Sequence, residues 1–198
     1  MLMKFYAVKK GRQPGIYTTW PDAQKQVHGF SGAKYKSFTS QEEALAYMEE
    51  QPQAPITDNQ LVAYVDGSYH KIKKAYGSGV AFIFNGQEIE SLSFSGNRDI
   101  FLEAHQVAGE CLASLAAIKW ALLHDYPSIT ICYDYQGVES WATGEWRTNK
   151  PISQAYKKEF DRFSQEIQVH FRKVHAHSGD PLNDRADQLA KAALGITV

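Results

Sequence analysis

The chain of 198 residues is poor in cysteine, nearly neutral overall and without a long apolar run. Its two cysteines, Cys111 and Cys132, lie in apolar segments without metal-like spacing. This argues against a disulfide framework and a zinc site, and predicts buried free thiols in a reducing compartment. No apolar run approaches the roughly 18 residues of a transmembrane helix, and the N-terminal segment is charged too early for a signal peptide. We therefore expect a cytoplasmic protein that binds no membrane.

The net charge of −1 does not indicate a nucleic-acid-binding protein, but the distribution of charge does. Residues 1–48 hold seven Lys and Arg against three acids, a balance of +4. The remaining 150 residues hold fourteen against nineteen, a balance of −5. A basic front and an acidic rear predict that affinity and chemistry are divided between two modules.

The boundary between these modules is predicted at residues 49–59, where two prolines stand among polar residues. Each proline removes a backbone donor and restricts the residue before it, which favours a short extended linker. Ahead of it, residues 4–8 and 34–38 are typical of strands, and 14–15 of a turn. One helix is predicted to start near residues 19–22, with Pro21 early in it. A second helix is predicted to begin at a capping box formed by Ser40 and Glu43 and to end at Met48. Residues 1–48 thus predict a small α+β domain.

Residues 60–198 predict an α/β domain with a mixed five-stranded sheet flanked by helices. Strands at 60–66, 76–84 and 87–95 form a meander, with Asn85-Gly86 as a two-residue hairpin turn. A helix is expected at 105–124, with Val107, Cys111, Leu115, Ile118 and Leu122 on one face. The remaining elements are predicted as a strand at 128–134, helices at 136–142 and 151–166, a strand at 168–174 and a helix at 183–194.

Four carboxylates stand in contexts that fit a single metal site. Asp66 closes the run Leu-Val-Ala-Tyr-Val-Asp and Asp134 closes Ile-Thr-Ile-Cys-Tyr-Asp, while Glu110 and Asp187 lie in helical segments. Acids at the ends of buried strands are unfavourable unless a cation neutralises them. The alternative for each is a solvated surface acid or a helix cap. Asp184 is interpreted in this second way, as a first-turn acid favoured by the helix dipole.

Residues 60–198 resemble type 1 ribonuclease H along their whole length. The resemblance rests on Asp66-Gly-Ser, on Ala108-Gly-Glu110, on Asp134 at the end of the fourth strand, and on the segment His175-Ala-His-Ser-Gly-Asp-Pro-Leu-Asn-Asp-Arg-Ala-Asp187-Gln-Leu-Ala. It implies a ribonuclease H-like sheet and two Mg²⁺ ions, with Mn²⁺ as a substitute, roughly 3.5–4 Å apart. Asp66 would bridge the ions, Glu110 and Asp134 would complete the shell, and Asp187 would bind the ion that positions the nucleophile.

The same resemblance implies roles for residues around the acids. His177 matches a mobile histidine that assists proton transfer or product departure, the alternative being an ordinary loop histidine. The candidates for contacts to the hybrid are Ser68, Gln106, Gly109, Glu110 and Asn183. The chain departs from many relatives by carrying His105-Gln106 where they have Asn or Thr before the helix glutamate. It also lacks the Lys-rich protruding loop of some single-domain relatives.

Residues 4–48 resemble the hybrid-binding, viroplasmin-like domain found ahead of many ribonucleases H. The matching segments are Lys4-Phe-Tyr-Ala-Val-Lys-Lys-Gly-Arg12, Gly15-Ile-Tyr-Thr-Thr-Trp20 and Ala33-Lys-Tyr-Lys36-Ser-Phe38. The resemblance places Tyr6, Trp20, Tyr35 and Lys36 on a contact face, where rings pack on sugars and cations meet phosphates. A second lysine often follows Lys36 but is Ser37 here. The alternative is that the aromatic residues fill a small core, which we expect for Phe5 and Phe38.

Taken together, the sequence predicts an endonuclease that cuts the RNA strand of RNA/DNA hybrids. One rival is a non-catalytic hybrid-binding protein, which clustered acids facing phosphate disfavour. Another is an integrase- or resolvase-like DNA nuclease on the same fold, which the Gly109-Glu110 pair and the front module disfavour. Protein partners are not indicated by the sequence.

Overall fold

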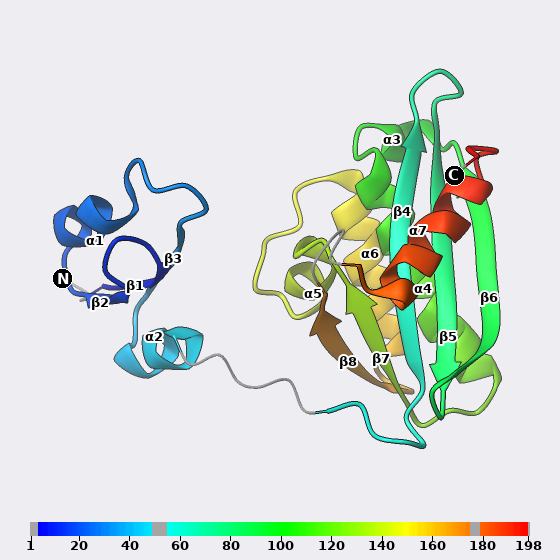
Figure 1. The fold of residues 1–198 in the computed structure, drawn as a ribbon, viewed down its shortest axis with the longest axis horizontal. Coiled ribbons are helices and arrows are strands. Elements are labelled where there is room, and N and C mark those ends of the chain that lie inside the picture. Colours follow the sequence, from blue (N-terminus) through cyan, green and yellow to red (C-terminus); the bar gives the residue numbers. More distant parts are fainter. Residues whose placement is uncertain (1–3, 49–54, 175–178, 198) are drawn as a thin grey trace. The chain divides into compact units, whose positions relative to one another are not determined.

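The computed structural model describes residues 4–48, 55–174 and 179–197 and divides the chain into two compact units, Met1–Ala54 and Pro55–Val198 (Figure 1). The division falls inside the segment 49–59 for which the sequence predicts a linker. We call the two parts the front unit and the rear unit.

The front unit is a three-stranded antiparallel sheet with two helices. Its strands follow the order β2-β1-β3, so the first strand is central. Val8 from the central strand packs with Ala23 and Val27 to form a small core. The elements are β1 (Phe5–Lys10), β2 (Gly15–Tyr17), α1 (Trp20–Val27), β3 (Lys34–Phe38) and α2 (Gln41–Met48).

Both front helices begin where the sequence predicts. The Thr19 hydroxyl accepts a hydrogen bond from the Asp22 N–H at 3.4 Å, and Pro21 lies in the first turn of α1. Ser40 Oγ likewise accepts from the Glu43 N–H at 3.3 Å at the start of α2. These bonds satisfy backbone donors that the first turn of a helix leaves unpaired. The three-residue strand β2 was not predicted, because Gly15 was assigned to a turn.

The rear unit is built on a five-stranded mixed sheet in the order β6-β5-β4-β7-β8. The first three strands of the chain in this unit pair antiparallel, and the last two add in parallel. The fold class predicted from the sequence is therefore confirmed. The elements are β4 (Val62–His70), β5 (Ala75–Phe84), β6 (Gln87–Gly96), α3 (Asp99–Leu102), α4 (Gln106–Leu123), β7 (Ser128–Tyr133), α5 (Gly137–Ala142), α6 (Pro151–Phe163), β8 (Gln168–Lys173) and α7 (Pro181–Ala192).

The two faces of this sheet are covered by different helices (Figure 1). α4 and α6 pack on one face, where Val65, Phe82, Ile118 and Ile131 belong to the larger core cluster. α7 packs on the other face, where Val62 and Tyr64 contact a smaller cluster that includes Ala186 and Leu189. Successive side chains of a strand point to opposite faces, so residues 62, 64 and 66 share the α7 face.

The strand β4 differs from its prediction. The sequence places its end at Asp66, but pairing with β5 continues to His70↔Ala75. The antiparallel partner supplies backbone hydrogen bonds beyond the last buried residue, which a pattern of alternating hydrophobicity does not reveal. Asp66 therefore lies within a strand rather than at its end.

The helix α4 is the central helix of the rear unit. Its 18 residues have a mean hydropathy of 1.2, enough by length and composition to cross a membrane, but half of them are buried inside the protein. Cys111 and Ile118 of the predicted face are fully buried, whereas Leu115 and Leu122 are only partly buried. Several other buried positions of the helix are small residues, among them Ala108, Gly109, Ala113 and Ala117. The predicted face is thus buried in part.

Candidate active site

The acids meet where two strands of the sheet separate. β7 pairs with β4 only over Thr130–Cys132, so β4 beyond Tyr64 keeps β5 as its one neighbour. Asp66 lies on this one-sided stretch, and Asp134 follows the last residue of β7. Asp66 belongs to the α7 face and Glu110 comes from α4 on the opposite face. The gap beside β4 lets acids from both faces approach one another.

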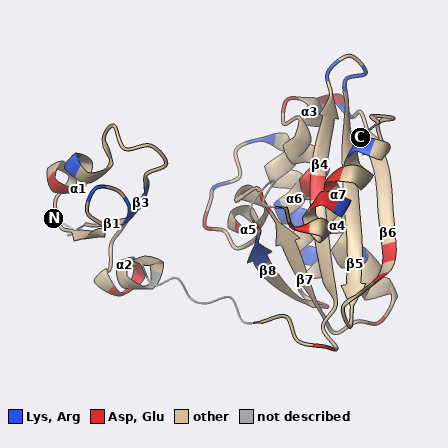
Figure 2. Cartoon of the chain, viewed as in Figure 1, with Lys and Arg blue, Asp and Glu red and all other residues tan. Residues whose placement is uncertain are grey.

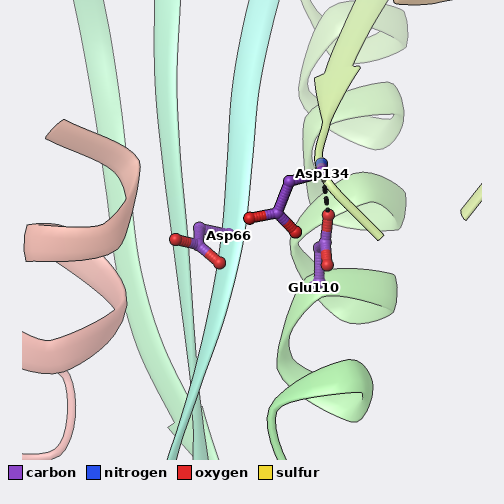
Figure 3. A group of neighbouring side chains, drawn as sticks. All are labelled: Asp66, Glu110 and Asp134. Carbon is purple, nitrogen blue, oxygen red and sulfur yellow. Dashed lines mark hydrogen bonds between the residues drawn. The ribbon is translucent and has the colours of Figure 1, made fainter. Parts of the chain in front are cut away.

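Three carboxylates converge in this gap (Figure 3). One oxygen each from Asp66, Glu110 and Asp134 lies within 4.8 Å of the others. Glu110 is only 3% exposed, and its Oε1 accepts hydrogen bonds from the backbone N–H groups of Asp134 at 3.1 Å and Tyr135 at 3.3 Å. Asp66 Oδ1 accepts from the Gly67 N–H at 2.7 Å. Backbone donors therefore fix two of the three side chains.

Two glycines allow this convergence. A Cβ on Gly67 would stand 2.0 Å from the Gln106 carbonyl oxygen, and one on Gly109 would stand 2.0 Å from the Gly77 carbonyl oxygen. A real Cβ cannot come so close to backbone, so any other residue would push α4 away from the sheet. The glycines in Asp66-Gly-Ser and Ala-Gly-Glu110 thus hold the helix carrying Glu110 against the strand carrying Asp66.

The three acids repel one another and are poorly hydrated. Burial is the main cause that raises the pKa of Asp66 to about 7, and the neighbouring Asp134 adds to it. Burial, followed by Asp134 and Asp66, also raises the pKa of Glu110 well above its usual value. Perturbed carboxylates gathered in a cleft are typical of functional sites.

The acids line a cavity of about 330 Å³. Its wall also includes Asp187, so all four predicted acids face one space. Asp187 is ion-paired with Lys191 one turn further along α7, with 2.6 Å between Oδ2 and Nζ. The other lining residues are Gly67, Gln106, Val107, Tyr135, Asn183 and Asp184.

A divalent cation fits this donor set. The ligands offered are carboxylate oxygens, which hard ions such as Mg²⁺ prefer, and a cation would neutralise acids that otherwise repel one another. Asn183 adds an independent indication. It is 4% exposed, and its Oδ1 is the one buried side-chain polar atom of the described residues without a hydrogen-bond partner. Polar atoms left in this way are rare in folded proteins and suit a site that binds a ligand.

The other residues of the rear unit that were predicted to contact the hybrid or assist catalysis do not all lie at the cavity. Gln106 and Asn183 line the cavity, whereas Ser68 lies further along β4 and Gly109 is buried on the side of α4 that faces the sheet. His177 lies outside the described residues. Lys191 was not predicted, although its spacing of four residues from Asp187 on a helix is a usual signal for an ion pair.

The front unit brings three of its four predicted contact residues together. Trp20 stands 5.5 Å from Tyr6 and 5.6 Å from Tyr35, measured between ring centroids. Trp20 and Tyr35 are 37% and 46% exposed, so the rings form a surface cluster. Lys36 is the next residue after Tyr35 on β3 and points to the opposite face, where its Nζ lies 5.4 Å from the Phe38 ring centroid. The structure thus separates Lys36 from the rings.

Comparisons with known proteins agree with this division. Residues 4–48 match the family model described as the ribonuclease H1 N-terminal domain, and residues 58–195 match the RNase H model. Human ribonuclease H1 is 22% identical over 251 aligned residues, which cover 94% of this chain and 88% of that protein. Ribonuclease H of Tropheryma whipplei strain Twist is 30% identical over 70% of this chain and 86% of its own length.

Other relatives share only a short segment. Ribonuclease H of Crithidia fasciculata is 54% identical over 52 residues, which cover 26% of this chain and 10% of that protein. The match to the Saccharomyces cerevisiae enzyme covers 13% of that protein. The chain therefore spans a small part of the length of these relatives.

Solved structures share the fold of the rear unit. RNase H1 from Halobacterium salinarum superposes with a TM-score of 0.58 at 24% identity, over 69% of this chain and 98% of that one. LC11-RNase H1, solved in complex with an RNA/DNA hybrid, gives a TM-score of 0.57 at 15% identity, over 69% of this chain and 97% of that one. The RNase H model matches well over half of the residues, on the same unit that holds the acid cluster. This chain is accordingly a member of the ribonuclease H family.

Proposed function

We propose that this protein hydrolyses the RNA strand of RNA/DNA hybrids in a metal-dependent reaction. The observation that carries the proposal is the convergence of Asp66, Glu110 and Asp134 within 4.8 Å, in a family whose members are named ribonucleases H. The hybrid bound to the structural relative LC11-RNase H1 supports the choice of substrate.

We assign Mg²⁺ as the metal, with Mn²⁺ as a substitute, because the donors are all oxygens. Two such ions, when bound, supply an activated water and neutralise negative charge on the cleaved phosphate. Glu110, held by two backbone N–H groups, keeps one of its oxygens fixed toward the other acids. Asp187 faces the same cavity, and its use as a ligand replaces its ion pair with Lys191.

Three further residues are given roles in this proposal. We assign contacts to the sugar edge of a bound strand to Gln106, whose amide can donate or accept a hydrogen bond, and to the unpartnered Asn183 Oδ1, which can accept one. Contacts of this kind to 2′-hydroxyls distinguish RNA from DNA. We assign to His177 the assistance of proton transfer or product departure, on the strength of its place in the family motif.

The front unit is proposed to bind the hybrid. Its exposed cluster of Tyr6, Trp20 and Tyr35 offers faces on which sugars or bases can pack, and the unit carries +4 of charge over residues 1–48. Rings and cations together suit a nucleic-acid backbone. The rear unit would then supply the chemistry and the front unit much of the affinity.

The test is a panel of labelled duplexes: RNA/DNA, RNA/RNA and DNA/DNA, each incubated with Mg²⁺, with Mn²⁺ and with a chelator. The proposal expects cleavage of the RNA strand of the hybrid alone, and only with metal. Binding of the hybrid without cleavage would favour the non-catalytic alternative. Cleavage of DNA/DNA would favour the integrase- or resolvase-like alternative.

A further inference from the structure

The turn between β4 and β5 concentrates positive charge on the acidic rear unit. Lys71, Lys73 and Lys74 surround Ile72, and all four residues are exposed, Ile72 to 89%. Outside residues 1–48 the chain holds fourteen Lys and Arg against nineteen acids, so three of its cations stand in one four-residue turn. Figure 2 shows this blue turn protruding beyond the end of the sheet.

The turn is held in place from both faces of the sheet. Lys73 Nζ donates to the Leu194 carbonyl oxygen at 2.6 Å, just past the end of α7. On the α4 face, the ring of Tyr69 lies 4.4 Å from that of His105, measured between centroids. The Lys73 N–H also donates to His70 Nδ1 at 3.2 Å, which fixes the turn itself. The hairpin therefore presents its charges from a rigid base.

Lys71 and Lys74 differ from Lys73 in having no protein partner. Among residues 4–48, 55–174 and 179–197, neither forms a hydrogen bond or an ion pair. A polyanion close to this turn would meet two ammonium groups that need not break an existing contact. Such groups contribute to binding by releasing counterions from the nucleic acid.

The turn is also at a suitable distance from the acids. Asp66 lies in β4, which rises about 3.3 Å per residue, and Lys71 is the first residue after the end of this strand, five positions beyond Asp66. Lys71 therefore stands roughly 17 Å from Asp66. A double helix advances about 3.4 Å per base pair, so this separation corresponds to roughly five base pairs.

We propose that Lys71 and Lys74 form a phosphate-binding clamp that contacts the hybrid about five base pairs from the cleaved bond, with Ile72 packing against the sugars between them. This inference rests on the proposed function. It gives the rear unit a grip of its own on a substrate that its net charge of −3 (fourteen Lys and Arg against seventeen acids over residues 55–198) would otherwise repel. The clamp lies in the turn that directly follows the strand carrying Asp66, so it also fixes the distance between grip and cut.

The experiment compares two double variants of the full chain that remove the same charge. Lys71→Ala/Lys74→Ala removes both ammonium groups of the clamp. Lys119→Ala/Lys158→Ala removes two other exposed lysines, from α4 and α6, that do not line the cavity. Hybrid dissociation constants are measured in chelator across a salt series, and cleavage rates at saturating hybrid in Mg²⁺.

The clamp variant should bind roughly 2- to 30-fold more weakly at low salt, as expected for two exposed ion pairs. The slope of its log affinity against log salt should fall by about two. Its cleavage rate at saturation should match that of the parent chain, and the control variant should match the parent in both measurements. Equal losses in the two variants would reduce the effect to net charge and overturn the inference, as would an unchanged slope in the clamp variant.

Hybrid length provides a second readout. The parent chain should lose its advantage over the clamp variant when the hybrid ends fewer than about five base pairs from the cut on the side of the clamp. An advantage that persists on such short hybrids would place the lysines elsewhere and overturn the inference. If the parent chain neither cuts nor binds any hybrid, the proposed function fails and the clamp falls with it; cutting without a clamp effect overturns the clamp alone.

Discussion

Replacing Asp66 with Asn should stabilise the metal-free rear unit while it removes activity. Asp66 is largely buried beside Asp134 and Glu110, and its ionised form is unfavourable there without a cation. Asn has nearly the same shape, carries no charge, and its Oδ1 can still accept the hydrogen bond from the Gly67 N–H. The substitution therefore isolates the electrostatic contribution of one carboxylate to the free energy of unfolding.

The magnitude follows from the pKa. Burial and neighbouring acids raise the pKa of Asp66 from 3.8 to about 7. One pKa unit corresponds to about 1.36 kcal/mol, so ionised Asp66 destabilises the folded state by up to about 4 kcal/mol at pH 8. The Asn amide loses hydration of its own when buried, which costs about 1–3 kcal/mol. The expected net gain in the free energy of unfolding is about 1–3 kcal/mol.

The sign depends on pH. The folded-state pKa lies above the unfolded one, so the folded state holds an extra proton between about pH 4 and pH 7. Below about pH 4 the ionisation of Asp66 therefore costs the folded state no stability. The cost increases as the pH rises to about 7 and is constant above that pH. The advantage of Asp66→Asn over the parent chain should be small at pH 4.5 and full at pH 8.

The assay is urea unfolding in chelator at both pH values, followed by circular dichroism. Asp125→Asn is the matched control, because Asp125 is exposed beyond the far end of α4 and adopts a φ of 57° that Asn tolerates equally. It should change nothing. An Asp66→Asn protein that is destabilised at pH 8, or a difference from the parent chain that is the same at pH 4.5 and pH 8, would refute the electrostatic reasoning.

Three further outcomes are expected. His177→Ala should slow turnover at saturating hybrid by about 10²–10⁴-fold or less, and a complete loss of activity would make His177 essential. Deleting residues 1–48, or Trp20→Ala, should weaken hybrid binding without slowing cleavage at saturation, and the deletion should flatten the salt dependence of the dissociation constant. Lys191→Met should move the pH of half-maximal Mg²⁺-dependent activity upward, because Lys191 lowers the pKa of Asp66; a downward shift would contradict this.

Much of the rear unit could be predicted from local sequence. Asn85 and Gly86 join β5 to β6 with φ values of 51° and 74°, which Asn and Gly adopt more readily than other residues. The order of strands and helices follows from alternating and helical hydrophobic periods. The short helix α3 was missed because one helical turn is too short to show a period.

The buried side of α4 could be predicted from hydrophobicity only in part. Of the face expected from the helical period, Cys111 and Ile118 are fully buried, but Leu115 and Leu122 are only partly buried. Small residues occupy several other buried positions, where the helix lies close to the sheet. The close approach of Gly109 to the Gly77 carbonyl oxygen depends on tertiary packing between residues far apart in the sequence, so local patterns do not reveal it. The same is true of the gap beside β4, which depends on where β7 stops pairing.

The four acids of the cluster were predicted one by one from their motifs. In the structure, oxygens of Asp66, Glu110 and Asp134 lie within 4.8 Å of one another, and Asp187 lines the same cavity. The ion pair of Asp187 with Lys191 was not predicted, although the spacing of four residues on a helix is visible in the sequence. Lys36 lies on the face of β3 opposite to Tyr35, because neighbouring residues of a strand point to opposite faces. The family resemblance had placed both residues on one contact face.

The central claim is that the acid cluster performs a metal-dependent cut. It is tested most directly by the initial rate of RNA-strand cleavage in saturating Mg²⁺ for the parent chain, Asp134→Asn and the control Asp125→Asn. Hybrid binding by each protein is measured alongside. The account predicts that Asp134→Asn binds the hybrid nearly as well as the parent but retains at most a few per cent of its rate, while Asp125→Asn cuts normally. Cleavage by Asp134→Asn near the parental rate would contradict it.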